Sequence, residues 1–266
     1  MNGFAWGDFA VGLAWSAAAS LAVMLGTFAV AVRKGVHRIV DVAWGLGFAA
    51  VAGVSLLAST GAGDPGRRAL VTVLTAVWGL RLAGHIARRG RGHGEDPRYE
   101  RMLAKARGDR NLYALRMVYL LQGALVWLVS LPVQAAQYVP GPMSGLAWAG
   151  TALWAVGMFF EAVGDAQLAR FKGDPASKGR IMDRGLWRYT RHPNYFGDFC
   201  VWWGLFLIVC ESPAAAAVSV LSPLVMSLLL TKGSGKRLLE QHMAERAGYA
   251  EYASRTSGFF PLPPRR

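Results

Sequence analysis

The stretch 185-GLWRYTRHPNYFGDFCVWWG-204 passes from a basic segment into a run of aromatic and aliphatic residues. Its cations and near-cations, together with the residue just before it, are Arg184, Arg188, Arg191 and His192. A single acid, Asp198, lies inside the apolar part. Basic residues directly before a long apolar segment are typical of a helix that enters a membrane from the cytoplasm. The stretch therefore indicates a membrane protein with one acidic group inside the apolar segment.

The composition of the whole chain agrees with this interpretation. Of its 266 residues, 53% are hydrophobic and 17% are charged, and the mean hydropathy is +0.28. The apolar residues gather in blocks of about 20, the length that a membrane helix needs, which excludes an ordinary soluble domain. We predict an all-α integral membrane protein with seven transmembrane helices, near residues 8–32, 39–59, 69–87, 112–135, 145–168, 195–211 and 213–230.

The net charge of +13 would fit a nucleic-acid-binding protein, but the positions of the charges do not. In a seven-span arrangement, 25 of the 29 Lys and Arg residues fall on one side, in segments 33–38, 88–111 and 169–194 and in the tail from 232. Because positively charged loops stay in the cytoplasm, we expect the N-terminus outside and the tail in the cytoplasm. The charge reflects topology, and we expect no nucleic-acid partner.

The polar residues concentrate in the segments assigned to the cytoplasm, which makes that side the working surface. No linker or internal repeat divides the chain, so we expect a single domain over 1–266. Within its tail, 231–266, apolar residues recur at helical spacing and predict an amphipathic helix on the inner membrane face; they are Leu238, Leu239, Met243 and Ala247. Cys200 and Cys210 fit as small packing residues and indicate neither a disulfide nor a metal site.

Ionisable residues inside apolar segments are energetically expensive and usually face a polar interior. Here they are Asp41, Arg81, Arg116, Glu161, Asp165 and Asp198. They could pair with one another to lock the helix bundle. For Glu161 and Asp165, one helical turn apart on the same face, we favour a polar cavity.

The opening stretch also suits a particular kind of ligand. Guanidinium groups bind phosphate oxygens through two parallel hydrogen bonds, so Arg188 and Arg191 fit a phosphate. Asn194 and Asp198 could bind ribose hydroxyls or a carboxamide, and Tyr195, Trp202 and Trp203 offer flat walls for a ring. The pattern predicts an amphipathic cofactor that enters from the cytoplasm. Binding of anionic lipid headgroups beside an interfacial Trp belt would explain the cations and Trp, but not Asn194 or Asp198.

These residues carry a family resemblance. The segment "GLWRYTRHPNYFGD" resembles the signature of bacterial membrane proteins of the DUF1295 group, which belongs to the steroid 5-alpha-reductase superfamily. Further pieces agree in order: "DVAWGLGF" at 41–48, "WGLRLAGHI" at 78–86, "EDPRY" at 95–99, "FFEAVGDAQLARFK" at 159–172 and "GYAEYASRTSGFFP" at 248–261. The resemblance covers about residues 38–261 and implies a multi-pass protein of the bacterial cytoplasmic membrane.

What the resemblance implies is a reductase that binds NADPH from the cytoplasm and passes hydride to an activated carbon–carbon double bond. Asp165 then matches an acid facing the nicotinamide and ribose, Lys172 a phosphate-binding Arg, Asn194 an amide contact and Asp198 an acid usually written Glu. Arg81 matches a further Arg of the family. The complete set expected at the cofactor is Arg81, Asp165, Lys172, Arg180, Arg188, Arg191, His192, Asn194, Tyr195, Asp198 and Trp202.

The chain departs from the steroid enzymes where they use a Glu and a Tyr to polarise an enone carbonyl. The Tyr position lines up with Trp78, which has no transferable proton. We therefore expect an acid kept neutral by burial, Asp41 or Glu161, to act as the catalytic proton donor. The substrate is expected to be lipophilic: a steroid, a polyprenyl chain or an unsaturated acyl group.

Two other functions stay open. "RHPNYFG" and the tail are also similar to isoprenylcysteine carboxyl methyltransferases, which bind S-adenosylmethionine and carry paired glutamates early in the tail helix. Here that region reads "RLLEQHM", with Glu240 followed by Gln241, which favours the reductase. A non-enzymatic lipid-binding protein would fit the basic rim but gives the intramembrane acids no role.

Overall fold

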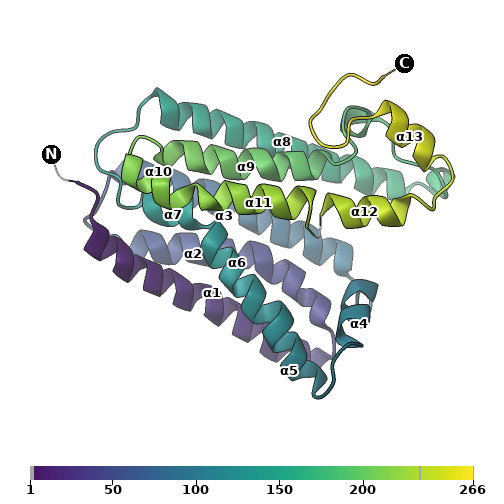
Figure 1. Cartoon of the computed structure of the whole chain (residues 1–266), viewed down its shortest axis with the longest axis horizontal. Coiled ribbons are helices and arrows are strands. Elements are labelled where there is room, and N and C mark those ends of the chain that lie inside the picture. Colours follow the sequence, from purple (N-terminus) through teal and green to yellow (C-terminus); the bar gives the residue numbers. More distant parts are fainter. Residues whose placement is uncertain (1–2, 234, 266) are drawn as a thin grey trace. The chain divides into compact units, whose positions relative to one another are not determined.

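The computed structural model describes residues 3–233 and 235–265; Met1, Asn2, Ser234, Arg266 and the side chain of Leu238 lie outside the described part. Within it the regular elements are helices, which confirms the all-α class for these residues. They are α1 (Trp6–Lys34), η1 (His37–Ile39), α2 (Val40–Ala58), α3 (Pro65–Gly90), α4 (Pro97–Leu103), α5 (Arg110–Ala114), η2 (Leu115–Leu120), α6 (Leu121–Val129), α7 (Leu131–Ala136), α8 (Gly145–Gly173), η3 (Pro175–Ser177), η4 (Gly185–Arg188), α9 (Pro193–Val209), α10 (Pro213–Ser219), α11 (Leu221–Thr231), α12 (Lys236–Met243) and α13 (Tyr249–Arg255) (Figure 1).

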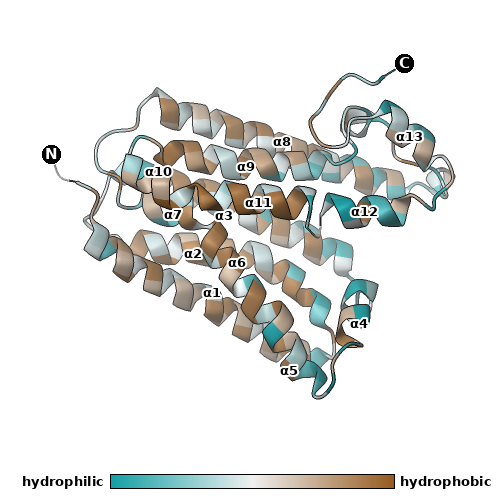
Figure 2. Ribbon diagram, in the orientation of Figure 1, coloured by the Kyte–Doolittle hydropathy of each residue, from teal (hydrophilic) through white to brown (hydrophobic). Residues whose placement is uncertain are grey.

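Among the described residues, six helical stretches are long and apolar enough to cross a membrane. They are Trp6–Lys34, His37–Ala58, Pro65–Gly90, Arg110–Val129, Gly145–Gly173 and Pro213–Thr231. These helices are apolar over most of their length, as the colouring in Figure 2 shows. The protein is therefore a membrane protein whose helices require a lipid bilayer. Each stretch corresponds to a predicted span, and the remaining predicted span, 195–211, coincides with the 17-residue helix α9.

The helices differ from the predicted spans where capping and proline residues act. The predicted span 112–135 is interrupted at Ser130, and α7 has a proline, Pro132, in its first turn, where the missing N–H is tolerated. Helix α3 begins at Pro65, four residues before the predicted start, because the Asp64 side chain accepts a hydrogen bond from the Arg67 N–H and caps the helix.

The chain folds into two compact units. The first consists of Met1–Ser144 with Ile208–Leu221, and the second of Gly145–Leu207 with Ser222–Arg266. In the first unit, α2 and α3 approach backbone to backbone, since a Cβ atom on either Gly45 or Gly79 would meet the other glycine's carbonyl oxygen. Small residues at such positions let membrane helices pack closely. The expectation of a single domain stays a prediction.

In the second unit, glycines at every seventh position bring α8 and α9 together. Gly157 faces Gly197, and Gly204 faces Gly150: a Cβ on Gly157, Gly197 or Gly204 would stand within 2.6 Å of the carbonyl oxygen of the facing glycine. The pairs run in opposite order along the two helices, so α8 and α9 are antiparallel. The same contact places the Cγ atom of Glu161 against Gly197, which explains how this acidic side chain is buried between the two helices.

The tail forms two short helices, α12 and α13, instead of one amphipathic helix. The chain turns between them at Gly248, whose φ of +81° is a left-handed conformation that glycine adopts without strain. Helix α12 is markedly polar, whereas the preceding α11 is apolar (Figure 2).

Candidate functional site

The basic stretch that precedes α9 is the surface on which the C-terminal tail packs. Thr190 and Ser257 form an isolated parallel β-bridge, and the Thr190 hydroxyl donates to the carbonyl oxygen of Phe259 over 2.8 Å. The Tyr252 hydroxyl donates to the carbonyl oxygen of Trp187 over 2.6 Å. Because Thr190, Trp187 and Tyr252 are buried, the tail is an integral part of the second unit.

Arg191 holds the tail through its whole guanidinium group. Its Nε and Nη2 atoms bind a carboxylate oxygen of Glu240 over 2.9 and 2.8 Å. Its Nη1 atom donates to the carbonyl oxygens of Ala253 and Thr256 over 2.9 and 2.6 Å. All three nitrogens are engaged and the side chain is only 14% exposed. The geometry thus gives Arg191 a structural role, although the sequence predicted a phosphate contact.

His192 is a neutral, buried imidazole held by the same carboxylate. Its Nε2 atom lies 3.0 Å from Glu240, and its ring stacks on Tyr195 with centroids 5.3 Å apart. Burial lowers the pKa of His192 to about 4, outweighing the opposite effect of Glu240. Burial alone would raise the pKa of Glu240, but hydrogen bonds from Arg191 and His192 hold it below its usual value. Near neutral pH, Nε2–H therefore donates to the Glu240 carboxylate.

The other residues predicted for a cofactor in this unit lie along α8, along α9 and in the loop between them. Glu161 is buried and Asp165 half-buried on one face of α8, which ends with the exposed Lys172. The loop carries exposed cations, Arg180 and Arg188. The first three turns of α9 carry Asn194, Tyr195, Asp198 and Trp202, of which Trp202 is fully buried. The antiparallel packing thus places the predicted acids on neighbouring helices.

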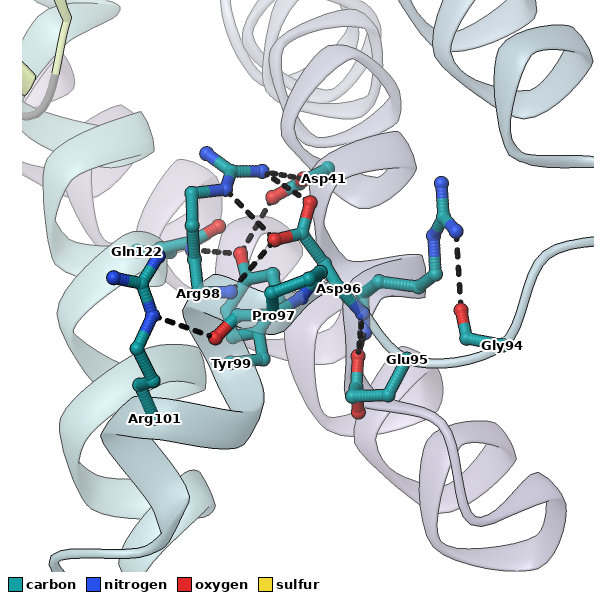
Figure 3. Close-up of polar contacts among 10 residues, drawn as sticks. Asp41, Gly94, Glu95, Asp96, Pro97, Arg98, Tyr99, Arg101 and Gln122 are labelled. Atoms are coloured by element: carbon teal, nitrogen blue, oxygen red, sulfur yellow. Dashed lines mark hydrogen bonds and ion pairs between the residues drawn. The ribbon is translucent and has the colours of Figure 1, made fainter. Parts of the chain in front are cut away.

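Two predicted residues, Asp41 and Arg81, belong instead to the first unit, on α2 and α3. Asp41 is the centre of a polar cluster (Figure 3). The Tyr99 hydroxyl donates to Asp41 Oδ1 over 2.5 Å, and Arg98 Nη2 lies 3.1 Å from Asp41 Oδ2. Gln122 donates to the Tyr99 oxygen over 3.5 Å. Residues from α2, α4 and α6 thus meet around one buried phenol.

The cluster separates a charged group from a proton-bearing one. Burial raises the pKa of the Tyr99 hydroxyl, and the negative charge of Asp41 raises it further. A hydrogen bond to Asp96 raises the pKa of Arg98, which keeps its positive charge beside Asp41. Asp41, held by a guanidinium and a phenol, therefore acts as a hydrogen-bond acceptor, and Tyr99 keeps the proton. The motif "EDPRY" was recognisable as a family motif, but no role for its Tyr could be predicted from it.

A second buried network lies at the start of α2. His37 Nδ1 lies 3.1 Å from the Tyr119 hydroxyl, and His37 Nε2 lies 3.2 Å from Asn111 Oδ1. Glu95 accepts the backbone N–H groups of His37 and Arg38 over 2.5 and 2.8 Å. Tyr119 stands on η2, a π-helix, an element that often occurs at functional sites. Because Glu95 and Tyr99 lie on one short segment, the hydrogen bonds that hold Glu95 at the start of α2 also help to hold Tyr99 in position.

The family model described as "Protein of unknown function (DUF1295)" matches residues 27–256. No curated protein and no solved structure matches the chain significantly.

Proposed function

Since the chain belongs to the DUF1295 family, whose function is unknown, we propose from its own residues that it is a membrane-embedded, NADPH-dependent reductase of an activated carbon–carbon double bond. The proposal rests mainly on the antiparallel pair α8 and α9. Three acids in apolar helical segments, Glu161, Asp165 and Asp198, lie on this pair within one unit. Acidic residues inside apolar helical segments are rare and usually have a functional role.

The residues of the second unit fit the chemical parts of NADPH. The exposed cations Lys172, Arg180 and Arg188 suit its phosphates, because charge-assisted hydrogen bonds to phosphate are strong. Asn194, at the start of α9, offers amide groups for the carboxamide or a ribose. Asp165 and Asp198 offer acceptors for ribose hydroxyls. When bound, the cofactor supplies the hydride, and these residues bind and orient it.

The protein must also supply a proton. Reduction of an enone adds hydride at one carbon and a proton at its neighbour, and a donor must lie within hydrogen-bond reach of the carbonyl oxygen. We assign this role to Glu161, which lies with the proposed cofactor contacts in the second unit. The Glu161 residue is buried, with 3% of its surface exposed. The substrate we propose is lipophilic, of steroid, isoprenoid or lipid type, since it must reach groups in a membrane protein.

The alternative is an S-adenosylmethionine-dependent methyltransferase, which would need a carboxylate on the tail helix for the cofactor's amino group. Glu240 is the acid in that position, but Arg191 and His192 bind the same oxygen of it, at 2.8 and 3.0 Å. This engagement favours the reductase. Titration of the detergent-purified protein with both cofactors separates the two functions: NADPH should bind, and S-adenosylmethionine should not.

The cofactor assignment predicts the effect of single substitutions. Arg188→Gln should weaken NADPH binding by about 10- to 100-fold, because one charge-assisted contact contributes about 1.5–3 kcal/mol. Arg246→Gln, which removes an exposed tail cation, is the control and should bind as the parent does. Fluorescence titration of NADPH measures both. Unchanged affinity in Arg188→Gln and in Asn194→Ala would exclude this site.

We also propose seven spans, with α9 as the additional one, the N-terminus outside and the tail in the cytoplasm of a bacterial cell. This orientation is supported by the distribution of Lys and Arg. Reporter fusions after Arg91, after Lys178 and at Arg266 should report cytoplasm, and one near Gly141 should report the outside. A periplasmic signal after Lys178 would place the proposed phosphate contacts away from the cytoplasmic nucleotide pool and would contradict the proposed cofactor site.

A further inference from the structure

Two adjoining surface hollows meet where α11 ends and α12 begins, each of about 380 Å³. One is apolar and is lined by Val225, Leu228, Leu229, Lys232 and Gly233. The other is polar and is lined by Thr231, Lys232, Lys236, Arg237, Glu240 and Gln241. Lys232 lines both hollows, so together they form one groove, apolar along α11 and charged at its end. We call it the α11–α12 groove.

The local sequence explains this shape. The side chains of Val225, Leu228, Leu229 and Lys232 are spaced at i, i+3, i+4 and i+7, so they lie on one face of the helix. After Lys232 the chain turns sharply: Gly233 N–H donates to the Leu228 carbonyl oxygen and Gly235 N–H to that of Leu229, over 2.9 and 3.2 Å. A Cβ on Gly235 would stand 2.5 Å from the Leu230 carbonyl oxygen, so this tight turn requires glycine.

The charged end of the groove carries a net positive charge. Lys232 and Arg237 are exposed and Lys236 is half-buried. The carboxylate on this lining, Glu240, binds Arg191 and His192, so its charge is already balanced by Arg191. Three cations therefore face the hollow beside one neutralised acid.

We propose that the α11–α12 groove binds an anionic glycerophospholipid. Its phosphate lies among Lys232, Lys236 and Arg237, and an acyl chain lies along Val225, Leu228 and Leu229. The site is separate from the proposed cofactor contacts, which lie on α8, on α9 and in the loop between them. The cations stand at the end of the candidate membrane helix Pro213–Thr231, where headgroups are expected.

The apolar half of the groove distinguishes a lipid from a nucleotide. Phosphate oxygens of either ligand would suit the cations. A ribose or base beyond the phosphate would need polar partners, whereas Val225, Leu228 and Leu229 provide only apolar surface. Leu228 itself is 55% exposed. An acyl chain would cover this surface without leaving any polar atom unsatisfied.

The test uses the full-length protein in a neutral detergent with two added lipids of equal chain length, phosphatidylglycerol and phosphatidylcholine. Binding is measured by native mass spectrometry, and stabilisation by thermal unfolding. Lys236→Gln/Arg237→Gln should bind phosphatidylglycerol about 30-fold more weakly than the parent, at about a tenfold loss for each 1.4 kcal/mol and about 1 kcal/mol for each cation. Arg246→Gln/Arg265→Gln removes the same charge from exposed tail positions and should bind as the parent does.

Further measurements distinguish a lipid site from a phosphate or nucleotide site. Leu228→Ser should weaken binding of long-chain but not of short-chain phosphatidylglycerol. If glycerol 3-phosphate protects as well as the lipid, or NADPH displaces the lipid, the groove is a phosphate or nucleotide site and the proposal is wrong. Equal losses in both double variants would show attraction by net charge alone and would also overturn it. Should the first double variant fail to fold, Lys232→Gln takes its place with the same expected direction.

Discussion

Replacement of Glu161 by glutamine is expected to lower turnover by about a hundredfold or more while NADPH affinity stays unchanged. The substitution keeps the shape of the buried side chain and removes the carboxyl proton that is proposed to reach the substrate. General acid catalysis commonly contributes about a hundred- to ten-thousandfold. NADPH oxidation with a panel of lipophilic enones identifies a substrate for the parent and then measures the variant.

Glu245→Gln is the matched control, since Glu245 is an exposed carboxylate in the same unit, and it should turn over at the parent rate. Solvent deuterium should appear on the product carbon next to the one that receives the nicotinamide deuterium. A Glu161→Gln variant with parental kcat would exclude this carboxyl group as the proton donor.

Asp41 could be found from the sequence, whereas its role could not. An acid at the start of an apolar segment is visible in "VDVAWGLGF" and signals an unusual position. Its partners, Arg98 and Tyr99, lie 57 and 58 residues away in a polar segment. No local pattern specifies which loop residues return to a helix end. In the structure Asp41 accepts the Tyr99 hydroxyl and lies 3.1 Å from Arg98, and the sequence around Asp41 indicates neither contact.

The contacts of Arg191 could not be predicted from its local sequence either. Its place in a basic cluster before an apolar helix suggested phosphate, and a free guanidinium there would bind one. The tail returns to the stretch 49 residues later with Glu240 and with backbone carbonyls at Ala253 and Thr256. Backbone acceptors leave no signature in a sequence, so their competition for the guanidinium could not be foreseen.

Most of the helices could be predicted, because a membrane helix needs a long apolar segment and such a segment is easily recognised in a sequence. Helix ends were harder to place, since they depend on single groups, as with the Asp64 cap of α3. A consequence is that Arg67, which precedes the predicted span 69–87, lies in the first turn of α3 with no exposed surface. A fully buried cation requires a partner.

That partner is Glu211, within the same first unit. Arg67 Nη2 binds Glu211 directly, and Arg67 Nη1 donates to the carbonyl oxygens of Val139 and Gly141 over 3.1 and 3.2 Å. The other oxygen of Glu211 accepts the backbone N–H of Ser144 over 2.7 Å. The carboxylate thus joins the start of α3 to the chain on both sides of Gly141.

Glu211→Gln is therefore expected to destabilise the protein by about 3–5 kcal/mol, the usual effect of removing one partner from a buried ion pair. The amide keeps the size of the side chain but leaves the Arg67 charge buried without its counter-charge. Glu251→Gln is the control: it breaks the ion pair with Arg255 at 3.6 Å, in which the Glu251 side chain is 77% exposed, and such surface pairs contribute about 0–1 kcal/mol. Unfolding of both variants in mixed detergent micelles, followed by circular dichroism, gives the difference. A loss in Glu211→Gln no larger than in Glu251→Gln would mean that the carbonyl oxygens alone hold Arg67, and the ion pair would then have no part in fixing the start of α3.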